Sequence, residues 1–168
     1  MNIKGKMVTL RAIELKDLPL LAKWSNSPEL WQNLVGWHFP YSELSTEQYI
    51  KNINHNNMKF QNFAIDVDGL GLIGTINLVE IDWKNRNACN GIMLGDMDTR
   101  GKGYALDAVM AIMRYAFKEL GLHRLDAEMI DYNNRSIDFY TKKCGWCIEG
   151  KRAEWIYRNG TYYDKVLC

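Results

Sequence analysis

The chain has 168 residues, of which 47% are apolar and 24% are charged, and its formal net charge is +1. This length and composition predict a soluble globular protein, and we expect a single domain that spans residues 1–168. The small net charge argues against bulk electrostatic binding to nucleic acid or to an anionic membrane. No apolar run reaches the roughly 18 residues of a membrane span, and no signal-peptide pattern follows the N-terminus, so we expect a cytoplasmic protein.

The N-terminal third predicts a strand and two helices. Residues 7–11 alternate between apolar and polar side chains, as in a short strand. Asp17 precedes a helical apolar pattern and Pro19 lies in its first turn, so Asp17 is the expected cap of the first helix. The second helix is expected to begin at Ser45 and to run through Ile50.

The segment between these helices, residues 30–41, is unusually aromatic. It contains two weak helix breakers, Gly36 and Pro40, so we expect a loop or a short helix that packs over another part of the chain. One interpretation is a satellite hydrophobic cluster, and the other is the wall of a substrate pocket. On the second interpretation, the candidate substrate-contacting residues are Trp31, Trp37, His38, Phe39 and Tyr41.

Three strands are expected in the middle of the chain. Residues 60–67 and 72–81 flank the turn sequence Asp68-Gly69-Leu70-Gly71 and predict a hairpin. Residues 88–94 predict the third strand, which leads directly into a glycine-rich loop.

That loop, Arg100-Gly101-Lys102-Gly103, precedes a long apolar helix expected over residues 104–120. No Ser or Asp caps this helix, so its first backbone N–H groups lack a side-chain acceptor and have the positive end of the helix dipole behind them. Strand, loop and helix N-terminus together predict a phosphate or pyrophosphate cradle, the alternative being an ordinary strand-to-helix turn. The spacing matches neither a P-loop nor Gly-x-Gly-x-x-Gly. Within the helix, Asp107, Arg114 and Lys118 are expected to share one polar edge.

The C-terminal part predicts a strand, a helix and a hairpin. Residues 122–129 alternate like a strand, Asn133 or its neighbour is expected to cap the next helix, and Gly145 to end it. Asn159-Gly160 is a strong hairpin signal. The sequence stops at Cys168 in mid-strand, which suggests a truncated tail. The whole order predicts a mixed α/β domain with one central sheet.

The four cysteines do not predict a cofactor. Cys144 and Cys147 have the C-x-x-C spacing of redox sites and of half a zinc site. However, the pair falls where a helix ends, and Cys89 and Cys168 supply no second pair. Two incidental thiols are therefore the favoured interpretation, and we expect no metal site.

Two motifs in the expected order resemble those of one enzyme superfamily. Residues 100–105, with the pattern Arg-x-x-Gly-x-Ala, resemble the acetyl-coenzyme A loop of the GNAT N-acetyltransferases. Residues 133–146, with Asn-x-x-Ser-x-x-x-Tyr and a final Gly-Trp, resemble the later motif of the same superfamily. Within it, the chain looks most like the branch that contains ribosomal-protein N-terminal and spermidine N-acetyltransferases.

The resemblance implies a mostly antiparallel sheet of six to seven strands, splayed by a bulge near Gly91, with about four helices. It implies acetyl-coenzyme A as cosubstrate, with its pyrophosphate on the amides of the glycine loop and its pantetheine arm paired like an extra strand with residues 92–94. The implied cofactor-binding residues are Ile92, Met93, Leu94, Arg100, Gly101, Lys102, Gly103, Tyr104, Ala105 and Asn133.

The implied reaction is direct attack of a primary amine on the thioester within a ternary complex. Tyr140 is at the position of the acid that protonates the leaving thiolate, the alternative being a core tyrosine. Relatives often have a glutamate base where this chain has Cys89. A water chain, His38 and Glu80 are therefore the alternatives for receiving the proton of the amine.

The acceptor is open between a peptide N-terminus, an aminoglycoside-type drug and an amino sugar. Residues 31–41 contain no acidic side chain, and this disfavours spermidine, because a polyamine needs several carboxylates. The alternative function is a noncatalytic acyl-coenzyme A-binding regulatory domain. The aromatic excess is compatible with a homodimer.

Overall fold

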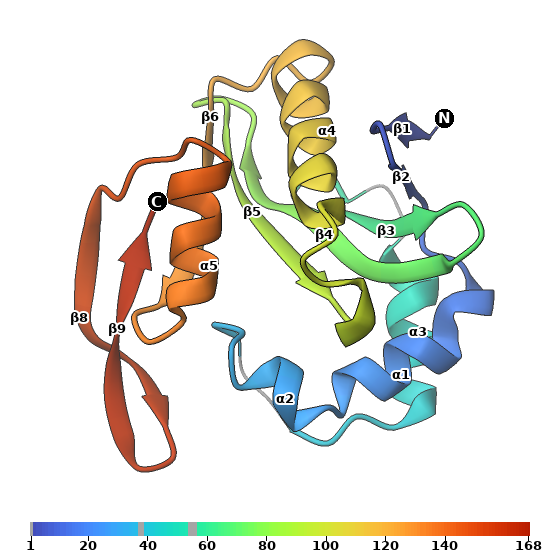
Figure 1. The fold of residues 1–168 in the computed structure, drawn as a ribbon, viewed down its shortest axis with the longest axis horizontal. Coiled ribbons are helices and arrows are strands. Elements are labelled where there is room, and N and C mark those ends of the chain that lie inside the picture. The colour runs from blue at the N-terminus through green and yellow to red at the C-terminus, as the bar shows by residue number, and fades with distance from the viewer. Residues whose placement is uncertain (1, 37–38, 54–56) are drawn as a thin grey trace.

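The computed structural model describes residues 2–36, 39–53 and 57–168, and Figure 1 shows its fold. The strands of the described residues form two sheets, one with the order β1-β2-β3-β4-β5-β6 and one with the order β7-β9-β8. All neighbours are antiparallel except β5 and β6, which are parallel. The strands are β1 (Ile3–Lys4), β2 (Val8–Arg11), β3 (Gln61–Val67), β4 (Gly71–Asp82), β5 (Asn87–Leu94), β6 (Arg124–Asp126), β7 (Glu128–Ile130), β8 (Gly150–Arg158) and β9 (Thr161–Leu167).

Helices cover the sheets and connect them. None of those in the described ranges is long and apolar enough to cross a membrane. The α-helices are α1 (Leu18–Ser25), α2 (Pro28–Trp31), α3 (Glu43–Ile53), α4 (Tyr104–Lys118) and α5 (Asn134–Asp138), and a π-helical turn (Phe139–Lys143) continues α5. The predicted mixed α/β class and the mostly antiparallel sheet are confirmed.

Two hydrophobic clusters lie on opposite faces of the six-stranded sheet. Ala64 and Ile65 are neighbours on β3 and therefore point to opposite faces, and both are fully buried. Ile65 belongs to the cluster that α4 completes, whereas Ala64 belongs to the cluster formed with α1, α2 and α3. In Figure 1, α4 lies against the six-stranded sheet and α5 against the smaller one.

The predicted central sheet is present with six strands, but a second, three-stranded sheet adjoins it, because strand pairing changes partner at Ala127. Up to Asp126 the chain pairs with β5, and from Glu128 it pairs with β9. The Ala127 N–H donates to the Cys168 carbonyl at 2.7 Å, and the Cys168 N–H returns to the Ala127 carbonyl at 3.0 Å. The predicted strand over 122–129 is therefore two short strands in two sheets.

The starts of two helices differ in detail from the prediction. Asp17 precedes α1, but its carboxylate accepts the Glu14 N–H at 2.9 Å and pairs with Arg11 at 2.8 Å instead of capping α1. The second helix, α3, begins before Ser45, and the Ser42 hydroxyl accepts the Ser45 N–H at 3.0 Å. Asp17 is thus the N-cap residue by position without a capping hydrogen bond, and α3 begins two residues before Ser45.

The predicted polar edge of α4 holds for Arg114 and Lys118, which are exposed, but not for Asp107. Asp107 is only 9% exposed. Its carboxylate accepts the backbone N–H groups of Lys6, Met7 and Val8 at 2.9, 2.6 and 3.0 Å. A charged residue at a helical surface position is thus used to hold the N-terminal strands against α4.

Candidate active site

The two sheets separate along β5. β6 pairs with β5 only from Asn87 to Cys89, so the outer edge of β5 from Asn90 to Leu94 lacks a partner strand in the described structure. The expected splay near Gly91 is therefore present. The expected bulge at Gly91 is not, because Gly91 pairs regularly with Asn77, and the register shifts on β4 between Val79 and Asp82 instead.

The glycine loop joins this open edge to the N-terminus of α4. Gly101 and Gly103 have φ values of 77° and 89°, which are left-handed conformations that only glycine adopts readily. Gly103 is the N-cap of α4 and provides no side-chain cap. Among the described residues, none accepts a hydrogen bond from the backbone N–H groups of residues 101–105. These five amides, with the positive end of the helix dipole behind them, have the arrangement that suits an anion.

Positive charge gathers beside the cradle. Arg100 donates from its guanidinium to the Leu94 carbonyl at 3.3 Å, so it lies across the open end of β5. Burial lowers the pKa of Arg100, and the neighbouring charge of Arg135 acts in the same direction. Arg100 nevertheless stays protonated at neutral pH, as arginine does. Lys102 is exposed on the loop itself.

Tyr140, the predicted acid, lies where the sheets separate. Its side chain is 3% exposed and packs against Phe139 and Trp146, with ring centroids 5.3 and 4.9 Å away. Its hydroxyl donates to Asn90 Oδ1 at 3.0 Å. Burial raises the pKa of Tyr140, so its hydroxyl keeps its proton at any physiological pH.

The helix that carries Tyr140 contains a π-helical turn. The Cys144 N–H bonds to the Phe139 carbonyl at 3.0 Å, a separation of five residues. π-helical turns are rare in proteins as a whole, and those that occur frequently lie at functional sites. At the other end of the helix, Asn133 is the cap, as predicted, because its Oδ1 accepts the Ser136 N–H at 3.2 Å.

Asn90 is a residue that the sequence analysis missed. Its side chain is 2% exposed and joins Tyr140 to β4, because its Nδ2 donates to the Asn77 carbonyl at 2.8 Å. Asn77 in turn accepts the Gly91 N–H on its Oδ1 at 2.9 Å. No local sequence pattern indicates that Asn90 holds Tyr140, because the hydrogen bond between them joins two distant parts of the chain.

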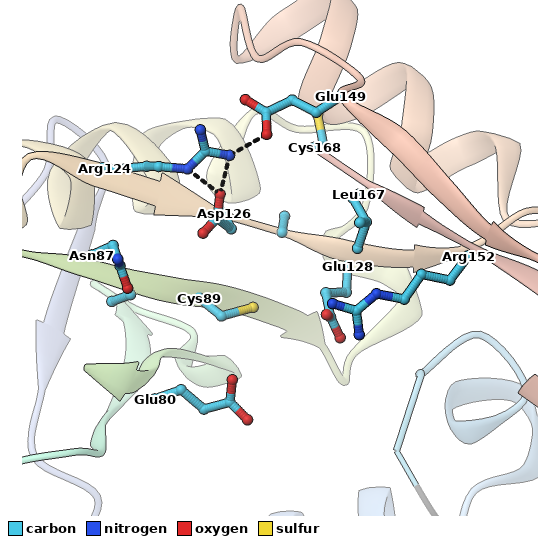
Figure 2. Close-up of a pocket in the computed structure, with 12 residues that line it drawn as sticks. Glu80, Asn87, Cys89, Arg124, Asp126, Glu128, Glu149, Arg152, Leu167 and Cys168 are labelled. Carbon is cyan, nitrogen blue, oxygen red and sulfur yellow. Dashed lines mark hydrogen bonds and ion pairs between the residues drawn. The ribbon is translucent and has the colours of Figure 1, made fainter. Parts of the chain in front are cut away.

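Cys89 lies on the opposite side of β5 from Asn90, in a pocket of about 290 Å³ rich in carboxylates. Figure 2 shows Glu80 and Glu128 beside it. Burial raises the pKa of the Cys89 thiol to about 12, and the nearby charges of Glu128, Asp126 and Glu80 act in the same direction. Cys89 is therefore a neutral thiol at neutral pH and is unsuited to act as a base there.

Glu80 differs from the other carboxylates of this pocket. Lys165 pairs with Glu128 at 2.7 Å, and Arg124 pairs with both Asp126 and Glu149. For Glu80 there is no ion-pair partner in the described ranges. Its backbone has φ 53° at the irregular register of β4, a strained conformation for a residue other than glycine. The register irregularity of β4 thus places the Glu80 carboxylate, without an ion-pair partner in the described ranges, beside Cys89.

Only some of the predicted substrate residues can be placed. Trp37 and His38 lie outside the described residues. Phe39 stacks on Tyr41 with ring centroids 4.6 Å apart, and Phe39 is 50% exposed. Trp31 lines a second pocket of about 420 Å³, between the end of α2 and the β8–β9 hairpin. The aromatic segment is therefore partly a pocket wall.

Comparison with known proteins agrees with the motifs. The family described as an acetyltransferase (GNAT) domain matches residues 7–146. A spermidine N(1)-acetyltransferase from Vibrio cholerae is 30% identical over 164 residues, which cover 95% of this chain and 90% of that protein. A putative ribosomal N-acetyltransferase of Bacillus subtilis, YdaF, is 28% identical over 95% of this chain and 88% of its own length.

The fold matches as well. The crystal structure of spermidine N-acetyltransferase from Vibrio cholerae in complex with CoA and spermine has a TM-score of 0.87 and 25% sequence identity, and the match covers 98% of this chain and 96% of that one. Because the family match extends over most of the sequence and includes the glycine loop and Tyr140, the chain belongs to the GNAT acetyltransferase family and is an acyltransferase.

Proposed function

We propose that this acetyltransferase moves the acetyl group of acetyl-coenzyme A directly to a primary amine while both substrates are bound. The observation that carries the proposal is the run of unpaired amides at residues 101–105, which follows the open edge of β5 along the chain. The amides and the dipole of α4 suit a pyrophosphate, and the open edge from Ile92 to Leu94 suits an extended amide-containing arm. Acetyl-coenzyme A supplies the thioester carbonyl that the amine attacks.

Asn133 and Arg100 fit the cosubstrate more weakly than the amides do. The Asn133 side chain already caps α5 and donates to the Asn33 carbonyl at 3.1 Å, which leaves one N–H for a further contact. Arg100 is partly engaged with Leu94, so its contribution is mainly its positive charge near the cradle. Affinity for the cosubstrate therefore depends chiefly on backbone groups.

Tyr140 donates to the leaving sulfur. The hydroxyl proton is free to rotate from Asn90 toward another acceptor on the open side of the sheet. A thiol has a pKa near 8.5, well below that of this buried phenol, so donation of a hydrogen bond to the developing thiolate contributes more than complete transfer of the proton. Asn90 keeps the phenol in place during this step.

The carboxylate that receives the proton of the amine is Glu80. It lies beside Cys89, where relatives often have a glutamate, and it has no competing ion pair among the described residues. Its uncompensated charge favours a cationic amine nitrogen at this end of the acceptor site. This weakens the sequence argument against spermidine, because that argument considered only residues 31–41.

The test combines calorimetric titration with acetyl-coenzyme A and thiol release with spermidine, a peptide with a free N-terminus, an amino sugar and an aminoglycoside. Tyr140→Phe should lower kcat by about 10²- to 10³-fold and leave the Kd for acetyl-coenzyme A nearly unchanged. Tyr115→Phe is the matched control, because it also removes one tyrosine hydroxyl hydrogen bond, the 3.2 Å bond to Gln61, away from the site. Binding without release on any amine would favour the noncatalytic alternative, and an unchanged kcat in Tyr140→Phe would remove Tyr140 from the chemistry.

A further inference from the structure

The segment 31–36, which follows α2, is held by side chains from the far end of the sequence. Arg158 lies near the end of β8, and Tyr132 and Asn133 lie between β7 and α5. Together they donate to five backbone carbonyls of the segment. The Arg158 guanidinium donates to Trp31 at 3.2 Å, to Gly36 at 3.3 Å and to Leu34, the Asn133 amide donates to Asn33 at 3.1 Å, and the Tyr132 hydroxyl donates to Gln32.

These contacts replace the regular secondary structure that the segment lacks. α2 is a single turn that ends at Trp31, and turn-like bonds follow it, from the Asn33 N–H to the Leu30 carbonyl at 3.2 Å and from the Leu34 N–H to the Trp31 carbonyl at 3.1 Å. Arginine has five donors in a rigid fork and can serve several carbonyls at once. Arg158 alone reaches three carbonyls spread over six residues, and this fixes the course of the segment.

The same contacts close one side of a pocket. The 420 Å³ pocket has one wall from Trp31, Val35 and Gly36 and the other from residues 155–159 of the β8–β9 hairpin. Arg158 lies on the second wall and bonds to the first. Arg158 therefore bridges the two walls of the pocket.

We propose that Arg158 is a positioning residue for the acceptor amine, acting through the segment 31–36. This inference rests on the proposed function and adds a residue that neither the glycine loop nor the Tyr140 motif predicts. Arg158 contacts none of the groups assigned to acetyl-coenzyme A or to proton transfer. Its loss releases one wall of the pocket while the amide cradle, Tyr140 and Glu80 keep their own contacts.

The test is Arg158→Ala, assayed with whichever of spermidine, a peptide with a free N-terminus, an amino sugar and an aminoglycoside the natural protein acetylates. A misplacement of the pocket wall by about 1 Å should raise KM for the amine roughly 10- to 100-fold. The kcat value and the Kd for acetyl-coenzyme A should change less than threefold. Millimolar guanidinium should bring the raised KM of Arg158→Ala part of the way back to the natural value, because guanidinium can occupy the vacated space and donate to the same carbonyls.

Lys151→Ala is the matched control, because Lys151 is an exposed cation on the same strand that contacts neither wall of the pocket. Hydrogen–deuterium exchange of peptides that cover 28–36 gives a readout without turnover, and it should increase in Arg158→Ala and not in Lys151→Ala. Unchanged exchange, or a fall in kcat with KM unchanged, would overturn the role of Arg158. If no amine is acetylated at all, the proposed function fails, and the exchange experiment still decides whether Arg158 holds the segment.

Discussion

Asp107→Asn tests how the N-terminal strands are attached to the rest of the fold. The substitution keeps the size of the side chain and removes its charge. The amide oxygen can still accept the Met7 and Val8 N–H groups, which both donate to Oδ2, but the amide NH₂ group then faces another donor, the Lys6 N–H. Gly5 adds to the constraint, because a Cβ atom there would lie 2.4 Å from Asp107 Oδ2.

The magnitude follows from the three hydrogen bonds to Asp107. A hydrogen bond to a charged group contributes about 1.5–3 kcal/mol, and a donor left unsatisfied costs about 1–3 kcal/mol when it is buried. Two of the three amides are only partly buried, so water offsets part of the loss. We expect a total loss of about 3–4 kcal/mol, which for a chain of this size lowers Tm by roughly 6–16 °C.

The pH dependence gives an independent check. Burial acts to raise the pKa of Asp107, but the hydrogen bonds from Lys6, Met7 and Val8 outweigh it and leave this pKa below its ordinary value. The stabilisation is therefore present above the unfolded pKa of about 3.9 and is lost as the pH falls through the lower folded value.

Thermal melts by circular dichroism should accordingly show the full difference between Asp107→Asn and the natural protein at pH 7. The difference should narrow below about pH 4, where the carboxylate of the unfolded chain becomes protonated. Lys118→Ala is the control, since Lys118 is exposed on the same helix. A Tm within 2 °C of the natural protein would refute the reasoning.

Three shorter predictions concern the site. Gly103→Ala should weaken acetyl-coenzyme A binding by about tenfold or more in calorimetry, because φ 89° strains any other residue at the N-cap of α4; equal affinity would contradict the cradle. Glu80→Gln should lower kcat/KM for the amine most at neutral pH, with partial recovery at higher pH as the free amine deprotonates in solution; a pH profile parallel to that of the natural protein would exclude Glu80 as the base. Iodoacetamide at pH 8 should modify Cys147 first, since it is exposed, whereas burial and nearby carboxylates raise the pKa of Cys89 to about 12; mass spectrometry showing faster labelling of Cys89 would argue against that environment.

Local signals in the sequence predicted much of the fold and the local structure of the glycine loop. The glycine loop, the uncapped start of α4, the Asn133 cap and the Asn159-Gly160 turn each depend on residues close together in the chain, and the structure has all of them. The placement of Tyr140 also followed, because its motif is contiguous.

The residues that sequence analysis missed act over long separations. Asp107 looked like a member of a polar helix edge, and only the path of the N-terminal strands shows what it binds. Asn90 and Arg158 meet partners 50 and more than 120 residues away. The positive φ of Glu80 arises from an irregular strand register, which no spacing of residue types announces.

The change of pairing at Ala127 has a mechanical consequence. The sheets meet at a vertex near Cys89 and Asp126 and diverge toward Leu94. At 3.3 Å per residue, the open edge of β5 extends about 16 Å from this vertex. A rotation of about 5° about the vertex would move the far end by roughly 1.4 Å and the vertex hardly at all. Such a rotation would change the width of the gap between the two sheets at Leu94. The surroundings of Tyr140, which lie close to the vertex, would keep their geometry.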